Sequence, residues 1–271
     1  MRQIGAVDIG GTKIAAGIVR EDGTLLDRIE CPTEPELGYA NALARIESML
    51  RQLIDRCGKI EGIGVACPGP LDPLSGIIGD VGTLPGWENS HLAEEIATRF
   101  GLSAAVENDA DAAALAEYAW GAVRPKGTLI YVTVSTGIGG GIVQAGQLYR
   151  GVHGAHPELG HQLIDPSGPL CYCGLSGCWE SLASGTALSS HYHKVAAESG
   201  SITAAEICER ARRGDPVAKQ AAMRTAHYIA LGLANLVTLF APDSIRLGGG
   251  VMQSSDLFLD EVRASVLRIC T

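Results

Sequence analysis

The hydrophobic pattern at the start of the chain has the period of strands and then the period of a helix. Apolar residues fill Ile4 to Val19 on both sides of Gly10-Gly11, and Asp22-Gly23 supplies a tight turn before a further apolar stretch. This pattern predicts a strand hairpin followed by a third antiparallel strand. From Tyr39 to Cys57 the apolar residues recur at helical spacing, and Gly58 stands where a C-terminal cap belongs. We therefore expect a helix packed on a sheet.

The alternation of strand and helix patterns continues along the chain. Residues 61–70 predict a buried strand that enters a Gly/Pro loop, and residues 103–121 predict a strand that turns into an Ala-rich helix. Residues 128–143 repeat the strand, Gly-rich turn and strand of the first hairpin. A long helix is expected from Asp215-Pro216, and residues 243–252 predict a buried strand ending in glycines at a helix start. Strands that alternate with helices indicate an α/β fold.

No linker rich in Ser, Pro or charge divides the chain. Because the hairpin pattern near the N-terminus recurs in the second half, we expect two α/β domains, residues 1–120 and 121–271, with the boundary near Gly121. A chain of 271 residues is long enough to form two hydrophobic cores.

Composition narrows the class of partners. The net charge is −9 and no basic cluster is longer than Arg212-Arg213, which argues against a nucleic-acid surface. The chain shows no charged and apolar leader and no apolar run near the ~20 residues that span a bilayer, so we expect a cytoplasmic protein without a membrane segment. In that compartment the scattered cysteines are expected to be free thiols: Cys31, Cys57, Cys67, Cys208 and Cys270.

Glycine-rich turns follow three of the predicted strands, at residues 10–13, 135–141 and 248–250. Such turns let backbone N–H groups approach an anion, and neighbouring hydroxyls add donors, but each turn alone is more typical of a hairpin. None has the sequence of a Walker loop or a dinucleotide motif. Together they favour a nucleotide site. Asp8, at the end of the first strand, would suit Mg²⁺ bound through water.

The sequence ENDADAAALAE places Asp109 at a strand-to-helix turn. Asp and Asn are preferred helix caps, so capping and catalysis are both open from spacing alone. Phosphoryl transfer to an alcohol requires a carboxylate that orients the hydroxyl and accepts its proton.

A cluster of soft ligands follows in the second half. His161, Cys171, Cys173 and Cys178 form the pattern H-x9-C-x-C-x4-C, and four such ligands suit tetrahedral zinc with no open position, which indicates a structural metal. The C-x-C spacing differs from the C-x-x-C of thioredoxin-type redox motifs. Four other histidines show no ligand spacing and are expected on the surface or in packing: His153, His191, His193 and His227.

Taken together, these motifs resemble the ROK sugar kinases of the actin-like ATPase superfamily. The resemblance covers nearly the whole chain and is carried by six segments: Asp8 to Lys13, Asn108 to Ala110, Ser135 to Gly141, Glu158 to His161, Cys171 to Glu180, and Leu247 to Val251. It implies two ribonuclease-H-like domains with a cleft between them that closes on a sugar. It also implies ATP-dependent phosphorylation of a hexose hydroxyl, with Mg²⁺ accompanying ATP.

The resemblance assigns roles to individual residues. It implies that Asp109 is the general base and that the substrate is bound by Asn108, Asp109, Glu158, His161, Glu180, Gly69 and Asn89, with His161 shared between zinc and a sugar hydroxyl. The implied nucleotide-binding residues are Asp8, Gly10, Gly11, Thr12, Lys13, Thr136, Gly137, Gly248, Gly249 and Gly250. Purely structural alternatives stay open for five of these residues. Glu158 and Glu180 could be helix-start residues, Gly69 and Asn89 could form loop turns, and Lys13 could be a solvated lysine.

The preferred sugar is less sharply indicated. The compact sequence CYCGLSGCWE resembles the glucokinase branch, which implies glucose as substrate and glucose 6-phosphate as product. The same sequence also resembles the N-acetylmannosamine kinase branch. N-acetylglucosamine is a further alternative. The run His156-Pro157-Glu158 is closer to the fructokinase branch. A non-catalytic sugar-binding regulator is the alternative of another class. A DNA-binding repressor is disfavoured because the first strand is expected within a few residues of Met1.

The C-terminal sequence ASVLRICT lies in a predicted helix. The resemblance implies a further strand and helix beyond this point that pack back on the first domain, so we expect apolar surface to be uncovered there. The resemblance also suggests a homodimer.

Overall fold

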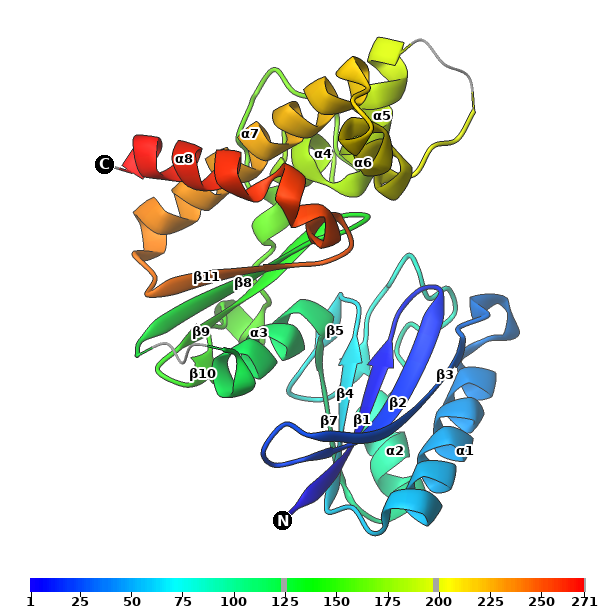
Figure 1. The fold of residues 1–271 in the computed structure, drawn as a ribbon. Helices are drawn as coiled ribbons and strands as arrows, with labels where there is room; N and C mark the ends of the chain where they lie inside the picture. Colours follow the sequence, from blue (N-terminus) through cyan, green and yellow to red (C-terminus); the bar gives the residue numbers. More distant parts are fainter. Residues whose placement is uncertain (123–125, 197–199, 271) are drawn as a thin grey trace. The chain divides into compact units, whose positions relative to one another are not determined.

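The computed structural model describes residues 1–122, 126–196 and 200–270. They form two compact units, each built on its own sheet (Figure 1). The first unit comprises Met1–Ala122 and Arg150–His156, and the second comprises Val123–Tyr149 and Pro157–Thr271. None of the described helices is both long and apolar enough to cross a membrane.

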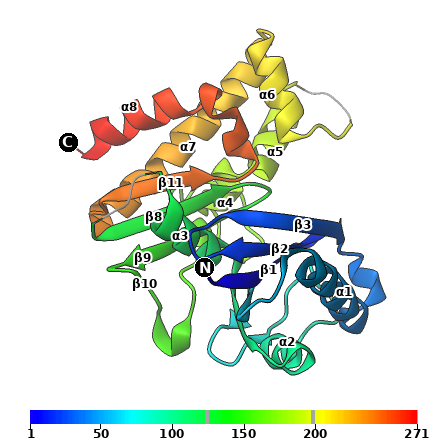
Figure 2. The same cartoon turned by 60° about the horizontal axis from the view of Figure 1, so that its bottom comes forward.

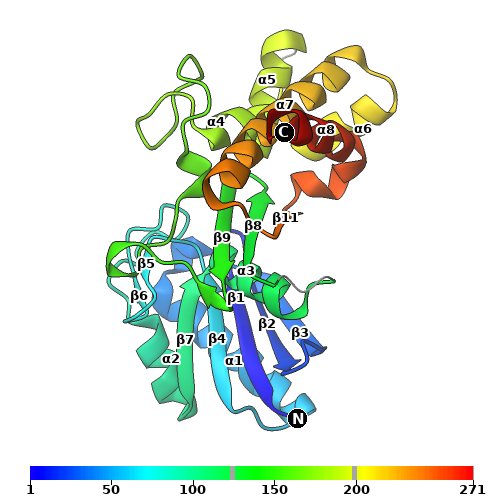
Figure 3. The same ribbon diagram turned by 90° about the vertical axis from the view of Figure 1, so that its left-hand side faces the viewer.

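The first unit contains a five-stranded sheet in the order β3-β2-β1-β4-β7 (Figure 3). Strands β1, β4 and β7 are parallel, whereas β2 is antiparallel to both β1 and β3. Its elements are β1 (Gln3–Ile9), β2 (Lys13–Arg20), β3 (Leu25–Pro32), η1 (Pro35–Leu37), α1 (Tyr39–Cys57), β4 (Gly62–Cys67), β5 (Leu71–Asp72), β6 (Ile77–Ile78), α2 (Leu92–Phe100), β7 (Ser103–Asn108), α3 (Asp109–Trp120) and η2 (Val152–Gly154).

The core of the first unit lies between this sheet and helices α1 and α2. Ile46, Leu50 and Leu53 repeat along one face of α1 and are fully buried, as the helical spacing predicts. Gly58 ends α1 with φ 94°, and its N–H donates to Ile54 O at 2.8 Å.

Small residues on the strands of this sheet leave space beside α3. They line a groove of about 580 Å³ together with the helix residues Leu115 and Trp120. The strand positions that line it include Ala6, Asp8, Ala15, Gly64, Ala66 and Ala105. This groove is largely apolar but reaches the Asp8 carboxylate at one end of β1.

The second unit contains a four-stranded sheet in the order β10-β9-β8-β11, in which β11 is parallel to β8. Helices α7 and α8 run side by side along it (Figure 2). Its elements are β8 (Thr128–Val134), β9 (Ile138–Gln144), β10 (Gln147–Leu148), η3 (Leu159–His161), α4 (Trp179–Ala183), α5 (Gly185–Ala196), α6 (Ala204–Arg212), α7 (Pro216–Phe240), β11 (Ser244–Gly248), η4 (Val251–Leu257) and α8 (Leu259–Cys270).

Two features of the second unit follow directly from its sequence. Asp215 caps α7, because its carboxylate accepts hydrogen bonds from Val217 N at 2.8 Å and Ala218 N at 3.1 Å. Gly232 leaves room for the buried indole of Trp179, since an added Cβ would lie 2.1 Å from that ring. The Trp179 indole N–H donates to Tyr228 O at 2.8 Å. These contacts fix the short helix α4 on α7.

The strand and helix pattern of the sequence is confirmed in both units, and the fold class is α/β. One boundary differs from the prediction. The segment after Gly248 to Gly250 is a 3-10 helix, and the α-helix expected there begins only at Leu259. Ser254 inside that segment has non-helical backbone angles, which separates the two turns.

Candidate functional site

Three parallel strands of the first unit end at the same edge of the sheet. In the strand register Asp8 pairs with Ala66, and Cys67, the next residue of β4, pairs with Asn108. The carboxyl ends of β1, β4 and β7 therefore bring Asp8, Cys67 and Asn108 together. Ligand sites of open α/β sheets form at this edge.

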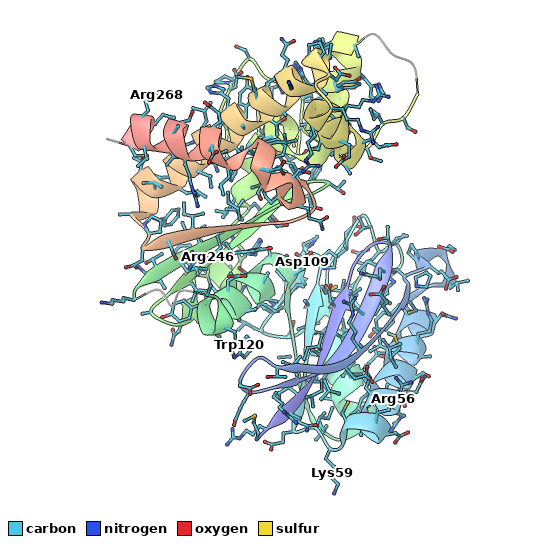
Figure 4. All side chains as sticks on the ribbon, viewed as in Figure 1. Arg56, Lys59, Asp109, Trp120, Arg246 and Arg268 are labelled. Atoms are coloured by element: carbon cyan, nitrogen blue, oxygen red, sulfur yellow. The ribbon has the colours of Figure 1, made fainter. Side chains whose placement is uncertain are left out.

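Asn108 and Asp109 form the turn between β7 and α3 (Figure 4). The Asn108 amide oxygen accepts hydrogen bonds from Ala110 N at 2.9 Å and Asp111 N at 3.3 Å, so Asn108 is the helix cap. Asp109 is the first helical residue, and one of its carboxylate oxygens accepts from Ala110 N at 2.8 Å. The capping role considered for Asp109 thus belongs to Asn108. The Asp109 carboxylate is exposed and has its second oxygen available as a proton acceptor.

Negative charge is concentrated at this edge. Burial raises the pKa of Asp8, and the Asp109 carboxylate raises it further, while Lys13 and Arg28 oppose the shift. Burial raises the pKa of the Cys67 thiol to about 12, again with contributions from Asp109 and Asp8. The Cys67 thiol is therefore neutral and unsuited to nucleophilic work at pH 7. A partly buried carboxylate whose pKa is raised by a second, neighbouring carboxylate is a suitable environment for a divalent cation.

The first glycine-rich turn is held in a fixed shape. Gly10 N donates to Lys13 O at 2.8 Å, and Thr33 N donates to Thr12 O at 3.0 Å. A Cβ on Gly11 would lie 2.9 Å from Thr83 Cβ, so only glycine fits there without a shift. The turn has the backbone shape of a tight hairpin whether or not it meets a phosphate.

The Lys13 side chain is partly engaged elsewhere. Its ammonium group lies 3.4 Å from a Glu30 carboxylate oxygen, and both side chains are about half exposed. This geometry agrees with the alternative of a solvated lysine.

Gly69 lies beside the Asn108 side chain, because a Cβ on Gly69 would lie 3.3 Å from the Asn108 amide nitrogen. Asn89 has a positive φ of 62°, and its N–H donates to Ile78 O at 2.9 Å, as expected for a loop turn. The structure therefore brings Gly69 to Asn108. Among the described residues no hydrogen bond joins Asn89 to Asn108 or Asp109.

In the second unit a pocket of about 470 Å³ joins two of the predicted glycine-rich turns. Thr136 comes from the turn between β8 and β9, and Gly250 follows β11. The Thr186 hydroxyl donates to Thr136 O at 2.8 Å, which fastens the start of α5 to the turn. Ser135 belongs to the same predicted turn as Thr136. The other lining residues were not predicted from the sequence, and they include Gly185, Thr186, Ser189, Thr203 and Gln253.

Gly248 and Gly249 pack closely against β8. A Cβ on Gly248 would lie 2.2 Å from the Tyr131 hydroxyl, and one on Gly249 would lie 2.5 Å from Val134 O. Gly249 also has φ 91°, which favours glycine. Of the three glycines, Gly250 is the one that lines the pocket.

His161, Cys171, Cys173 and Cys178 form one cluster. Their ligand atoms all lie within 4.8 Å of one another; Cys173 Sγ is 3.5 Å from Cys178 Sγ, and Cys171 Sγ is 3.7 Å from His161 Nδ1. Tetrahedral bonds of the usual zinc lengths separate ligand atoms by about 3.5–3.8 Å. Burial raises the pKa of Cys178 to about 12, so a bound cation is needed to hold it as a thiolate at neutral pH. The residues fit a structural zinc ion.

Tyr172 links this cluster to the predicted sugar-binding residues. Its hydroxyl lies 3.0 Å from His161 Nε2, and the two rings meet edge to face at 5.1 Å. Although the Tyr172 residue is 83% exposed, partial desolvation of its hydroxyl raises its pKa to about 12, and the Glu180 and Glu158 carboxylates add to the shift. The structure therefore places both glutamates and His161 around one tyrosine. Tyr172 was not predicted from the sequence, because its position between two cysteines suggests only a spacer.

Glu180 is held against the turn between β8 and β9. One carboxylate oxygen accepts a hydrogen bond from Ile138 N at 2.8 Å, and the same oxygen would lie 2.3 Å from a Cβ on Gly137. Gly137 is therefore required by the closeness of Glu180. Glu158 precedes the short helix η3 and makes no capping hydrogen bond with its side chain.

The model of the ROK family matches residues 4–270. The chain belongs to the ROK family.

Two curated ROK proteins are similar to this chain in sequence over most of its length. A glucokinase of Streptomyces coelicolor is 36% identical over 281 residues, covering 97% of this chain and 86% of the relative. An N-acetylmannosamine kinase of Escherichia coli O157:H7 is 36% identical over 254 residues, covering 91% of this chain and 82% of the relative.

A solved ROK structure is also similar. The glucokinase of Streptomyces griseus in complex with glucose and AMPPNP matches with a TM-score of 0.84 and 35% identity, covering 99% of this chain and 89% of that chain. The family and the fold class expected from the motifs are thus confirmed.

This ROK chain also carries a charged network that the sequence did not predict. Arg150 donates to Asp111 Oδ2 at 3.0 Å and forms an ion pair with Glu107, while His156 Nδ1 lies 2.8 Å from the same Asp111 oxygen. Asp111 is fully buried, and Glu107 accepts a hydrogen bond from Asn108 N at 2.8 Å. Arg150 therefore joins the residues immediately before and after the turn that carries the candidate base.

Proposed function

We propose that this ROK protein is an ATP-dependent hexose kinase that converts glucose to glucose 6-phosphate, with Asp109 as the general base. The observation that carries the proposal is the exposed Asp109 carboxylate beside the capping Asn108, at the carboxyl edge of the sheet. Glucokinase relatives that match over most of the chain support glucose as the sugar.

The chemistry follows from the groups at this turn. The sugar hydroxyl oxygen attacks the γ-phosphorus of ATP while the free Asp109 oxygen accepts the proton of that hydroxyl. ADP leaves with the bridging oxygen. Because the Asn108 amide oxygen is occupied by capping bonds, its NH₂ group is the part that donates to a sugar hydroxyl. Mg²⁺ that accompanies ATP would neutralise phosphate charge, with Asp8 holding it through water.

We propose that the nucleotide binds in the pocket that Thr136 and Gly250 line. Its hydroxyl groups and glycine backbone, and its volume of about 470 Å³, suit a nucleoside. The backbone N–H groups of Gly11 and Thr12 are proposed to meet the phosphates. Gly248 and Gly249 contribute by shaping the turn and not by direct contact.

We propose that the cluster of His161 and three cysteines binds structural zinc. Four protein ligands leave no coordination position for a water, so the ion has no catalytic task. Its role is to fix the loop between His161 and Glu180. Glu158, His161 and Glu180 are then presented to the sugar around Tyr172, with the His161 ring oriented by its bond to the Tyr172 hydroxyl.

The test is ADP release from ATP and Mg²⁺ on addition of glucose, fructose, N-acetylmannosamine or N-acetylglucosamine. We expect the highest kcat/KM with glucose. A preference for N-acetylmannosamine or fructose would correct the sugar while keeping the reaction. Saturable glucose binding without any ADP release would refute the kinase and favour a sugar-binding regulator.

A further inference from the structure

A separate polar pocket of about 420 Å³ lies in the second unit. The loop before the cysteine cluster and helices α4, α5 and α7 form its walls. Its lining contains Asp165, Ser181, His191, Lys194, Arg224 and Tyr228. None of the residues assigned to sugar, nucleotide or metal lines it.

Three basic side chains converge on this pocket. His191 and Lys194 are one turn apart on α5, and Arg224 projects from α7. Within the described part of the chain, none of the three forms an ion pair with a carboxylate. Unpaired basic groups in one pocket are unusual for a protein with a net charge of −9.

The Arg224 guanidinium is held in place without being neutralised. It donates to Leu182 O at 3.3 Å and stacks 4.7 Å from the centre of the Tyr228 ring. The one carboxylate in the pocket, Asp165, accepts from the Tyr228 hydroxyl at 2.9 Å and from Ser167 N at 3.0 Å. Neutral donors therefore occupy Asp165, and most of the Arg224 donors remain available.

The same excess of positive charge affects the pKa of the His191 ring. Burial lowers its pKa, and Arg224 and Lys194 lower it further. An anion bound among the three groups would oppose all of these effects, because it would stabilise the protonated ring.

We propose that this pocket binds a phosphate-type oxyanion, either inorganic phosphate or the phosphate group of a phosphorylated sugar. Arg224 offers the planar donor pair that matches phosphate oxygens, and Lys194 adds a mobile point charge. A volume of about 420 Å³ lies in the range of small-molecule pockets and exceeds what phosphate alone fills. The organic phosphate is therefore the better fit.

The pocket has a physical connection to α4. Leu182 holds Arg224 through its carbonyl, and the Ser181 hydroxyl donates to Cys178 O at 2.8 Å. Both residues belong to the five-residue helix that carries Glu180. An anion bound here would brace the same helix as the proposed sugar ligand.

The test measures binding at His191 itself and requires no turnover, so it stands or fails separately from the proposed kinase activity. The C2 proton of His191 is assigned among the seven histidines by its loss in His191→Gln and titrated by NMR with and without potassium phosphate, at ionic strength matched with potassium chloride. Phosphate is expected to raise the pKa of His191.

The matched variants are Lys194→Gln and Lys219→Gln. Both lysines are exposed, and Lys219 lies on α7 outside the pocket, so each change removes one charge with little risk to the fold. Lys194→Gln should weaken phosphate affinity about tenfold, whereas Lys219→Gln should not.

Parallel titrations with inorganic phosphate, glucose 6-phosphate and glucose identify the source of the oxyanion. Tighter binding of glucose 6-phosphate than of phosphate, with no effect of glucose, supports a phosphorylated sugar. Equal binding of the two phosphates supports free phosphate. A His191 pKa that responds no more to phosphate than to chloride, or equal phosphate affinities of the two lysine variants, would overturn the proposal.

Discussion

Burial and the neighbouring Asp109 carboxylate raise the pKa of Asp8 at the carboxyl edge of the first sheet. Because the folded protein holds the pKa of Asp8 above 3.8, Asp8 contributes stability at pH values below 3.8, and this contribution is lost as the pH rises through the folded pKa. At neutral pH the ionised carboxylate is therefore a cost to the fold. A group that destabilises the fold at its working pH is typical of a functional site.

We expect Asp8→Asn to raise the melting temperature at pH 7 and to lower kcat at subsaturating Mg²⁺, because the repulsion disappears together with the magnesium contact. Thermal unfolding and ADP release measure the two effects. Asp55→Asn, at an exposed position on α1, is the control that should change neither. A variant with a lower melting temperature and full activity would contradict this role of Asp8.

Arg150 forms ion pairs on both sides of the turn that carries Asp109. Its side chain is 22% exposed and bridges Glu107 and the fully buried Asp111, which also accepts the His156 contact. Lysine keeps the charge but cannot reach both carboxylates with a planar pair of donors.

Arg150→Lys should lower the free energy of unfolding by about 1–3 kcal/mol and lower kcat more than it changes the glucose KM, since the turn carrying Asp109 loosens. Urea unfolding and steady-state kinetics test this. Arg56→Lys alters an exposed pair with Asp27 and should cost at most about 1 kcal/mol. Equal effects of the two substitutions would show that Arg150 has no special role.

At the scale of elements, α4 connects three functions. It begins directly after the proposed metal ligand Cys178, carries Glu180 in its first turn, and is anchored through Trp179 to α7. A five-residue helix has little stability of its own, so its position depends on these attachments.

Removal of zinc should therefore weaken glucose binding more than ATP binding, because the loop between His161 and Glu180 loses its fixed shape. Calorimetric titration of both ligands before and after chelation measures this. Cys178→Ala should reproduce the loss, whereas Cys208→Ala, another buried cysteine of the second unit, should not. A larger loss of ATP affinity would break the proposed link between metal and sugar.

Elements were largely predictable because their signals are local. The period of apolar residues predicted α1 and the hairpin from Ile4 to Val19, and Asp215-Pro216 predicted the start of α7. Ligand spacing likewise predicted the cysteine cluster.

The contacts that complete the sites join segments far apart in the sequence. Arg150 forms a hydrogen bond with Asp111, and Thr186 forms one with Thr136. No periodicity in the sequence predicts contacts between residues this far apart. The close packing of Gly248 and Gly249 on β8 was not predictable either, because a glycine needed for close packing has the same letter as one that approaches a phosphate. Whether a glycine is needed for close packing or for approach to a phosphate depends on the atoms around it in the fold, and the sequence does not show these.

At the scale of the whole molecule, each unit has its own sheet and its own core. The segment Arg150–His156 belongs to the first unit although the surrounding chain belongs to the second. The proposed base lies in the first unit, and the proposed nucleoside pocket and zinc cluster lie in the second. Asp109 is the group on which the proposed chemical step depends.

The most direct test of that assignment is the rate at which Asp109→Asn forms glucose 6-phosphate from glucose, ATP and Mg²⁺. The asparagine keeps the shape of the side chain and the hydrogen bond to Ala110 N but cannot take up the proton. We predict a fall in kcat of roughly 100- to 10,000-fold with glucose affinity changed much less, while Asp55→Asn stays at the wild-type rate. A kcat for Asp109→Asn near the wild-type value would contradict Asp109 as the general base.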